Sequence, residues 1–313
     1  NIGDMKNRGF EFGVKAVIID KKKFQWTSNF NLTTNHNKVV SLTPELDVSG
    51  KGIGGTTRAI KGESLWTFFM PEYAGVDPER GVNLIYEIDV DHYNATGETI
   101  KTGRVIPATN NNLSNHRVLL KGKTTLPTYF GGFTNTFNIG NFDIDIMFSY
   151  SGGDYFYDYE EQRTTDVQYG QVVLRSDLIG NTWTPENRDT KYPELRWQGS
   201  YPWDWDPEAP SDDPLAPEGK GDWVERPGNY KNEQYNFSKY LYKADFIRLK
   251  NIQVSYNVPA DLVKRLGMQQ AKLFVSGTNL WTWTPEYKGW DPETQGVNLP
   301  PLKYLTLGAT ITF

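Results

Sequence analysis

Apolar and polar residues alternate strictly along the C-terminal segment, residues 302–313. The apolar positions are Leu305, Leu307, Ala309, Ile311 and Phe313, and the positions between them are Tyr304, Thr306, Gly308, Thr310 and Thr312. A period of two over a length that can cross a bilayer, closed by a C-terminal Phe, is typical of the last strand of an outer-membrane β-barrel. An amphipathic strand that ends a soluble sandwich would show the same alternation, so this segment favours a barrel without excluding a sandwich.

The same alternation recurs in other segments, namely 10–18, 24–33, 129–139, 141–150 and 273–281. In one of them, Asp143 and Asp145 stand opposite an unbroken apolar row, which predicts one solvated face and one apolar face. The segment 245–258 changes phase at Lys250-Asn251. Either a β-bulge or a misplaced strand boundary explains that change.

Short and long connections alternate between these segments. The short ones lie at 20–23, 140–141 and 259–267, and the last contains a helical turn or two; the long ones cover about 35–64, 90–126, 153–240 and 284–300. Such alternation fits a barrel with periplasmic turns and long extracellular loops. Strand direction then requires an odd count, about seven or nine strands depending on whether residues 58–92 supply two. Because single-chain bacterial barrels have even counts, we expect the C-terminal part of a larger barrel.

Composition narrows the classes of function. The 313 residues carry a formal net charge of −5, which gives no reason to expect nucleic acid. The absence of cysteine excludes disulfides and thiolate chemistry, and no apolar run of about 18 residues predicts a transmembrane helix. We interpret His36, His92 and His116 as surface or loop residues. No signal-peptide pattern opens the chain, so it was processed or its beginning lies elsewhere. No catalytic motif is present, so we expect neither enzyme activity nor a cofactor.

One stretch occurs twice with small changes. Residues 71–84, PEYAGVDPERGVNL, return as residues 285–299, PEYKGWDPETQGVNL, and each copy follows a Trp-Thr pair that begins at Trp66 or Trp281. Asp-Pro and Gly enforce turns at fixed places, which explains the repeat as a shared loop shape. The alternative is that both copies contribute to one ligand surface.

Five motifs occur in a fixed order along the chain. They are Asn7-Arg-Gly-Phe-Glu11, Trp183-Thr-Pro-Glu-Asn187 followed by Tyr192-Pro193, Asp245-Phe-Ile-Arg-Leu-Lys-Asn251, Gly277-Thr-Asn-Leu280, and the terminal strand from Gly308 to Phe313. In this order they resemble the SusC/RagA-like family of TonB-dependent outer-membrane transporters. The resemblance implies a barrel of about 22 strands, an N-terminal plug, a segment that engages TonB, and a SusD-like lipoprotein lid. It also implies import of oligosaccharides or peptides. The plug, the TonB-engaging segment and more than half of the barrel have no counterpart in this sequence.

The segment between Asn181 and Asn236 is rich in aromatic residues. The candidates for contact with a substrate or with the lid are Trp183, Trp197, Tyr201, Trp203, Trp205 and Trp223. Exposed rings of this kind stack on sugars or act as hot spots in protein interfaces, and the alternative is that they pack the loop onto itself. We expect Trp26, Tyr150, Trp281 and Trp283 in aromatic belts at the membrane interfaces instead.

An acidic cluster lies in the same segment, formed by Asp204, Asp206, Asp212 and Asp213. Clustered carboxylates can bind Ca²⁺. The spacing lacks the glycine and the terminal Glu of an EF-hand loop, so we interpret the cluster as a solvated acidic stretch and only weakly as a metal site.

These observations predict an all-β chain in the bacterial outer membrane. Residues 1–313 would form the C-terminal portion of the barrel, with 153–240 as a long extracellular loop region. The chain would contact lipid, the lipoprotein lid and a glycan or peptide substrate, and residues 305–313 would carry the barrel-assembly signal. The alternative is a soluble all-β carbohydrate-binding module, which would bury the apolar rows against a second sheet. A glycosidase is a third possibility.

Overall fold

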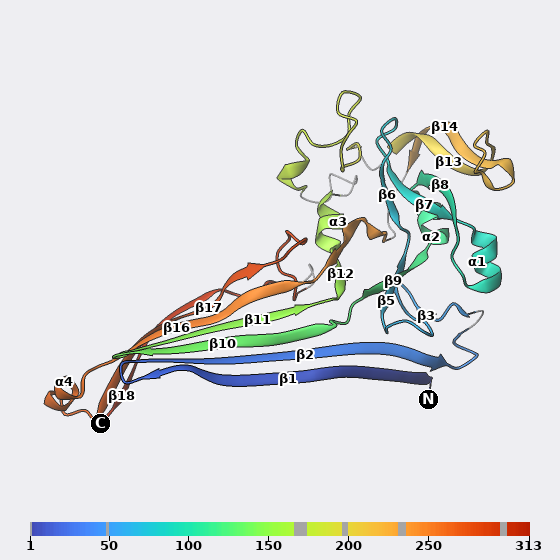
Figure 1. The fold of residues 1–313 in the computed structure, drawn as a ribbon. Coiled ribbons are helices and arrows are strands. Elements are labelled where there is room, and N and C mark those ends of the chain that lie inside the picture. Colours follow the sequence, from blue (N-terminus) through green and yellow to red (C-terminus); the bar gives the residue numbers. More distant parts are fainter. Residues whose placement is uncertain (1, 48–49, 166–173, 196–199, 231–235, 295–298) are drawn as a thin grey trace. The chain divides into compact units, whose positions relative to one another are not determined.

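The computed structural model describes residues 2–47, 50–165, 174–195, 200–230, 236–294 and 299–313 (Figure 1). The chain divides into two compact units. The first unit consists of Asn1–Lys6, Asn37–Thr125 and Tyr157–Leu241, and the second of Asn7–His36, Leu126–Phe156 and Tyr242–Phe313.

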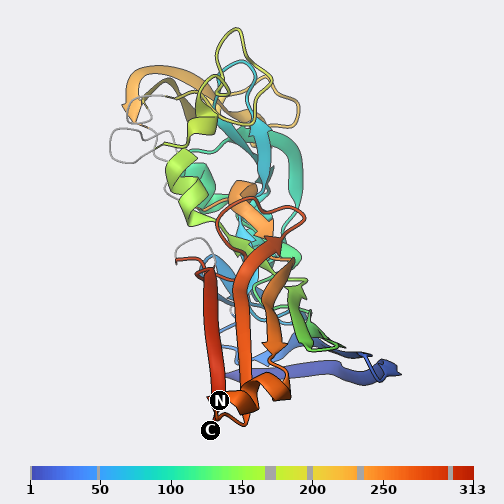
Figure 2. The same cartoon turned by 90° about the vertical axis from the view of Figure 1, so that its left-hand side faces the viewer.

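Most of the second unit belongs to one antiparallel sheet of seven strands. In spatial order the strands are β1 (Gly3–Lys21), β2 (Phe24–Leu42), β10 (Tyr129–Ile139), β11 (Phe142–Gly152), β16 (Phe246–Asn257), β17 (Gln270–Trp283) and β18 (Tyr304–Thr312). Figure 2 shows the twist of this sheet, because the orange and red strands β16 to β18 run across the direction of the blue strand β1. The lower of the two predicted counts is confirmed, since the strands within residues 58–92 belong to other sheets.

The short connections of this sheet lie where the sequence predicts them. Lys22 and Lys23 form the turn between β1 and β2, and Gly140-Asn141 forms the turn between β10 and β11. Gly140 adopts a φ of 60°, which a two-residue hairpin turn needs and which glycine adopts without strain. The connection from β16 to β17 contains α4 (Ala260–Arg265), the expected short helix.

Lys250 is the extra residue of a β-bulge in β16. In the pairing with β11, Met147 faces Asn251 and Phe148 faces Leu249, so Lys250 is skipped. The pairing with β17 shifts its register at the same place. The insertion brings Leu249 and Ile252 to the same face of the sheet despite their odd spacing. A bulge, and not a misplaced boundary, therefore explains the change of phase.

The first unit is built from smaller sheets. One contains β3 (Ile53–Gly54), β4 (Thr57–Ala59), β5 (Thr67–Met70) and β9 (Val118–Thr124); another contains β6 (Tyr73–Val76), β7 (Asn83–Ile88) and β8 (Lys101–Pro107); and a hairpin pairs β13 (Ser200–Pro210) with β14 (Lys220–Tyr230). The helices are α1 (Val90–Thr96), α2 (Asn110–Asn115) and α3 (Tyr159–Thr165), with 3-10 turns η2 (Ser176–Leu178), η3 (Pro217–Gly219) and η4 (Ser238–Tyr240). A further pair of strands, β12 (Tyr155–Tyr157) and β15 (Leu241–Lys243), has most of its residues in the second unit. The long region 153–240 thus contains regular structure, including α3 and the β13–β14 hairpin.

The core of the first unit forms around strands that are buried on both faces. All four residues of β5 are buried, and Ile85, Ile106 and Leu113 pack in the same unit with almost no exposed surface. His116 lies in the loop between α2 and β9, as the sequence predicts, and is half-buried there. Its Nδ1 accepts a hydrogen bond from the Ile88 N–H at 3.2 Å, and burial lowers its pKa to about 4.

Within the described ranges, no helix is long and apolar enough to cross a membrane.

Candidate functional site

Strand pairing aligns the apolar residues of the seven-stranded sheet into continuous rows on one face. One row contains Trp26, Phe137, Ile144, Val254, Val275 and Leu307, and a second contains Phe30, Phe133, Phe148, Leu249 and Trp281. Side chains that lie opposite one another share a face. Val275 is 52% exposed and Leu307 is 82% exposed. A sandwich would bury such rows against a second sheet, so their exposure contradicts the soluble-module alternative.

The opposite face of the sheet carries polar side chains that bond to one another. Asp143 accepts a hydrogen bond from Asn138 Nδ2 at 2.7 Å and forms an ion pair with Lys272 Nζ at 3.0 Å. Asp145 accepts a hydrogen bond from Thr136 Oγ1 at 2.7 Å. The sheet therefore has one exposed apolar face and one polar face, which is the division that a barrel wall between lipid and an aqueous lumen requires.

The predicted assembly residues lie together at the edge of this sheet. Pairing with β17 places Leu305, Leu307, Ala309 and Ile311 on the apolar face of β18, and Phe313 follows the strand. The side chains of Leu305 and Phe313 are 79% and 80% exposed. Their position suits a recognition signal at the last strand, and that role stays a prediction.

Aromatic rings lie at both ends of the strands on the apolar face. Trp281 and Trp283 are about half exposed near the end of β17, and Tyr150 lies in the same cross-strand row as Trp283. Trp26 lies toward the opposite end, near the Lys22-Lys23 turn, and stacks on Phe137 with 5.7 Å between ring centroids. This placement is the one expected of two interfacial aromatic belts.

Trp183 belongs to the packing of the first unit and is not free to contact a ligand. Only 6% of its surface is exposed, and its Nε1 donates a hydrogen bond to the Pro78 carbonyl oxygen at 3.0 Å. A Cβ atom at Gly81 would lie 2.5 Å from the Trp183 ring, so the backbone contacts the indole closely. Trp197 and the side chain of Tyr201 lie outside the described residues.

The remaining tryptophans belong to the β13–β14 hairpin and are held by arginines. The rings of Trp205 and Trp223 pack edge to face with 5.9 Å between centroids. The Arg104 guanidinium lies 5.4 Å from the centroid of Trp205, and that of Arg80 lies 4.9 Å from Trp223 and 6.0 Å from Trp203. Cation–π contacts of this kind fix the ring orientations. The half-buried faces that remain form an aromatic surface on the hairpin.

Arg104 is the residue that anchors this hairpin. Its side chain is buried and contacts Asp213 Oδ2 at 2.7 Å, the Gly221 carbonyl oxygen at 2.9 Å and Glu87 Oε1 at 3.5 Å. The Leu215 N–H and the Arg104 guanidinium together lower the pKa of Asp213, whereas burial raises the pKa of Glu87. Asp213 therefore serves as an ion-pair partner of Arg104.

The other acidic candidates show no arrangement for a metal. Asp204 and Asp206 lie on β13, and Asp206 Oδ1 accepts a hydrogen bond from the Glu208 N–H at 2.9 Å. Asp212 is exposed. In the part of the chain that the structure describes, no three His, Asp or Glu side chains are grouped so that they could hold a metal ion.

The two copies of the repeated stretch share a turn, as expected if the repeat specifies a loop shape. Asp77 Oδ1 accepts the N–H of Glu79 at 2.8 Å, and Asp291 Oδ1 accepts the N–H of Glu293 at 2.9 Å. Both aspartates are buried. The copies belong to different units, and residues 295–298 of the second copy lie outside the described residues.

Trp290, which sequence analysis missed, projects from the second copy. It is 69% exposed, although its neighbours on both sides are fixed. Tyr287 packs on Phe156 with 4.5 Å between ring centroids, and Asp291 forms a buried ion pair with Arg248 at 2.8 Å. The signal was available in the repeat, because Trp290 replaces Val76 at an otherwise matching position.

Known proteins resemble this chain in sequence and in fold. The chain is 27% identical to the TonB-dependent receptor P3 of Formosa agariphila across 94% of this chain and 26% of that protein. It is 44% identical to the TonB-dependent receptor SusC of Bacteroides thetaiotaomicron across 14% of this chain and 4% of SusC. The solved structure of the RagAB peptide transporter shares the fold with a TM-score of 0.72 and 23% identity, covering all of this chain and 30% of that one. No protein-family model matches the chain.

The chain spans about a quarter of the length of the receptor P3. Within that span the relatives named as TonB-dependent receptors, the RagAB fold and the ordered motifs agree with one another. The chain is therefore similar in sequence to TonB-dependent receptors, SusC among them, and shares the fold of the RagAB transporter.

Proposed function

We propose that this chain forms part of the barrel wall of an outer-membrane importer. The importer takes up oligosaccharides or peptides, uses a SusD-like lipoprotein as a lid, and is driven through TonB by parts of the receptor outside this sequence. The observation that carries the proposal is the two-faced sheet, in which Val254, Val275 and Leu307 continue one exposed apolar row across three strands. A non-enzymatic role agrees with relatives that are named as receptors and transporters.

Two aromatic surfaces are the proposed extracellular contacts. The first is the arginine-held hairpin with Trp203, Trp205 and Trp223, and the second is the loop that presents Trp290. Aromatic side chains that are held rigidly lose little entropy on binding, which suits hot spots for a protein lid and stacking surfaces for a substrate. Trp183 is excluded from this role, since its ring is buried against Gly81.

Adjacent positions on β17 provide a direct test of the wall. Val275 and Ser276 point to opposite faces, and a cysteine at either position would be the only one within these 313 residues. We would introduce Val275→Cys or Ser276→Cys into the full-length receptor, attach a nitroxide, and measure its accessibility in lipid vesicles. The label at 275 should collide mainly with oxygen dissolved in lipid, and the label at 276 with a water-soluble relaxation agent. Equal access of the water-soluble agent to both sites would overturn the proposal.

A further inference from the structure

The short connections of the seven-stranded sheet carry positive charge, although the whole chain has a net charge of −5. Residues 20–25, 140–141 and 259–267 contain five basic and two acidic residues, whereas the long connection 153–240 contains nine basic and 18 acidic ones. Figure 1 shows the β1–β2 turn, the β10–β11 turn and α4 at the same end of the sheet. Because the short turns of a barrel wall lie on the periplasmic side, the positive charge belongs to the periplasmic rim.

Three consecutive lysines, residues 21–23, form the most basic of these connections, and we call them the lysine turn. All three side chains are exposed, and none of them forms an ion pair with a residue that the structure describes. The nearby carboxylate of Asp20 accepts a hydrogen bond from Gln25 Nε2 at 2.7 Å. The backbone is held by the adjacent hairpin, since the Gly140 N–H donates to the Lys23 carbonyl oxygen at 3.0 Å. The lysine turn therefore has a fixed backbone and ammonium groups that are available to a partner.

An exposed apolar row lies directly beside the lysine turn. It is the last row of the apolar face before the short connections, and strand pairing forms it from Phe24, Ile139, Phe142, Tyr256, Leu273 and Ala309. The side chains of Ile139, Phe142 and Leu273 are 44%, 46% and 50% exposed. Trp26 follows two residues after Phe24, and a tryptophan at this end of the face marks the depth of the lipid headgroups.

The kind of partner follows from these two neighbouring features. A molecule that fits both of them has an apolar chain for the row and an anionic group for the lysines. A phospholipid has this construction, with a phosphate at the membrane surface directly above its acyl chains. Each basic residue next to an anionic membrane surface strengthens the attraction about fivefold. Lysine suits this role because it is a point charge on a flexible stem that reaches a headgroup.

We propose that the lysine turn binds an anionic phospholipid of the periplasmic leaflet, with the phosphate at Lys22 and Lys23 and the acyl chains along Ile139 and Phe142. This inference rests on the proposed function, in which the sheet is part of a barrel wall, and it adds a lipid preference to that wall. The bound lipid holds the periplasmic end of β1 and β2 at the level of the headgroups.

A fluorophore at residue 141 reports on the lipid next to the lysine turn, because Asn141 is exposed and follows Gly140 in the β10–β11 turn. We would label Asn141→Cys in a full-length receptor with no other cysteine and reconstitute it into phosphatidylcholine vesicles. A small fraction of the lipid would carry brominated acyl chains, as either phosphatidylglycerol or phosphatidylcholine, and bromine quenches only at short range. Brominated phosphatidylglycerol should associate at least threefold more strongly than brominated phosphatidylcholine, and this preference should fall at high ionic strength.

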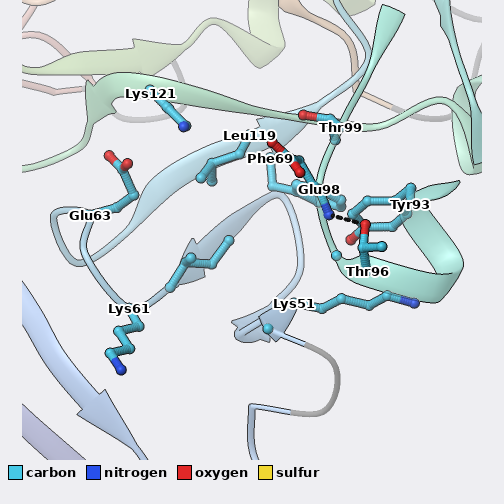
Figure 3. A pocket seen from close by; sticks show the side chains of 13 residues that line it. Lys51, Lys61, Glu63, Phe69, Tyr93, Thr96, Glu98, Thr99, Leu119 and Lys121 are labelled. Carbon is cyan, nitrogen blue, oxygen red and sulfur yellow. Dashed lines mark hydrogen bonds between the residues drawn. The ribbon is translucent and has the colours of Figure 1, made fainter.

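Two pairs of substitutions separate the lysine turn from the charge of the whole chain. Lys22→Gln with Lys23→Gln should remove the preference. The control pair Lys61→Gln with Lys121→Gln changes the total charge equally but affects two lysines that line a cavity of the first unit (Figure 3), and it should keep the preference. All four lysines are exposed, so both variants should fold.

The possible results distinguish this inference from the proposed function. Equal quenching by the two brominated lipids would overturn the inference and leave the lysines to an acidic periplasmic protein, while the wall itself would stand. A preference that persists in the Lys22 and Lys23 variant would also overturn it. Quenching by neither lipid would place the lysine turn outside the membrane, and would contradict the wall together with the inference.

Discussion

The buried ion pair between Arg248 and Asp291 should control the loop that presents Trp290. Arg248 is 1% exposed, and its Nη2 contacts Asp291 Oδ1 at 2.9 Å, Asp291 Oδ2 at 2.8 Å and Glu293 Oε2 at 3.0 Å. The substitution Asp291→Asn keeps the shape of the side chain and an oxygen that can accept the Glu293 N–H. It removes the charge that balances a guanidinium with almost no access to water.

The expected size of the effect follows from this burial. Loss of one partner of a buried pair costs about 3 to 5 kcal/mol. Glu293 remains as a partner, and its side chain is 39% exposed, which places the cost near the lower end of that range. A cost of about 3 kcal/mol corresponds to roughly a hundredfold change in the opening equilibrium of the loop.

Hydrogen exchange of the full-length receptor in detergent measures this opening. Amides of residues 286–294 should exchange roughly a hundredfold faster in Asp291→Asn than in the wild type. Glu293→Gln removes a more exposed carboxylate and should change the rate less than about fivefold. Exchange in Asp291→Asn within twofold of the wild-type rate would refute the reasoning, because the pair would then not hold the loop.

Substitutions at three other positions test the pKa of Asp154, the packing of Trp183 and the apolar face at Leu307. Burial, reinforced by a nearby carboxylate, raises the pKa of Asp154 from 3.8 to about 6. The folded state therefore binds the proton more tightly than the unfolded state. Ionisation of Asp154 lowers the stability of the folded state as pH rises from 3.8 to about 6, and the full loss is present at higher pH. Asp154→Asn should therefore raise the free energy of unfolding at pH 8 by about 1 to 2 kcal/mol, after allowance for partial exposure, and this should appear as a higher unfolding temperature. At pH 3 the substitution should leave the unfolding temperature unchanged. Trp183→Ala should cost about 3 to 5 kcal/mol locally and speed proteolysis within residues 181–195, whereas Trp183→Phe should cost less; equal protection of both variants would contradict its packing role. Leu307→Lys places a charge on the apolar face, at a cost of about 2 to 4 kcal/mol if the residue lies near the bilayer midplane; it should reduce the heat-modifiable folded band on gels, and the neighbouring change Thr306→Lys on the polar face should not.

The barrel wall was predictable because the alternation of apolar and polar residues with a period of two determines which face of the sheet each side chain occupies and restricts the register in which strands pair. Residues such as Ile144 and Leu307 alternate with polar neighbours, and pairing only had to bring the apolar positions into line. The bulge at Lys250 was visible as a change of phase. The strand count stayed open because β5, Thr67–Met70, is buried on both faces and has no alternation that would assign it to the wall or to another sheet.

The candidate contacts were harder to predict because they depend on partners far away in the chain. Arg104 and Asp213 are 109 residues apart, and nothing local to either residue indicates the pair. The hairpin did have a local signal, since Trp203-Asp-Trp-Asp206 alternates with a period of two, but the prolines around it favoured a loop. Trp183 was expected among several possible contacts, and only the position of Gly81 shows that its ring is enclosed.

The two copies of the repeat differ in a way that explains their separate roles. In the first copy, Asp77 pairs with Arg80 of the same turn at 3.5 Å, so the charge is balanced within the loop. In the second copy Thr294 replaces that arginine, and Asp291 pairs with Arg248 of β16 instead. The same turn is thus self-contained in one copy and tied to a strand of the sheet in the other. The tie fixes the backbone next to Trp290, which suits the contact role proposed for this residue.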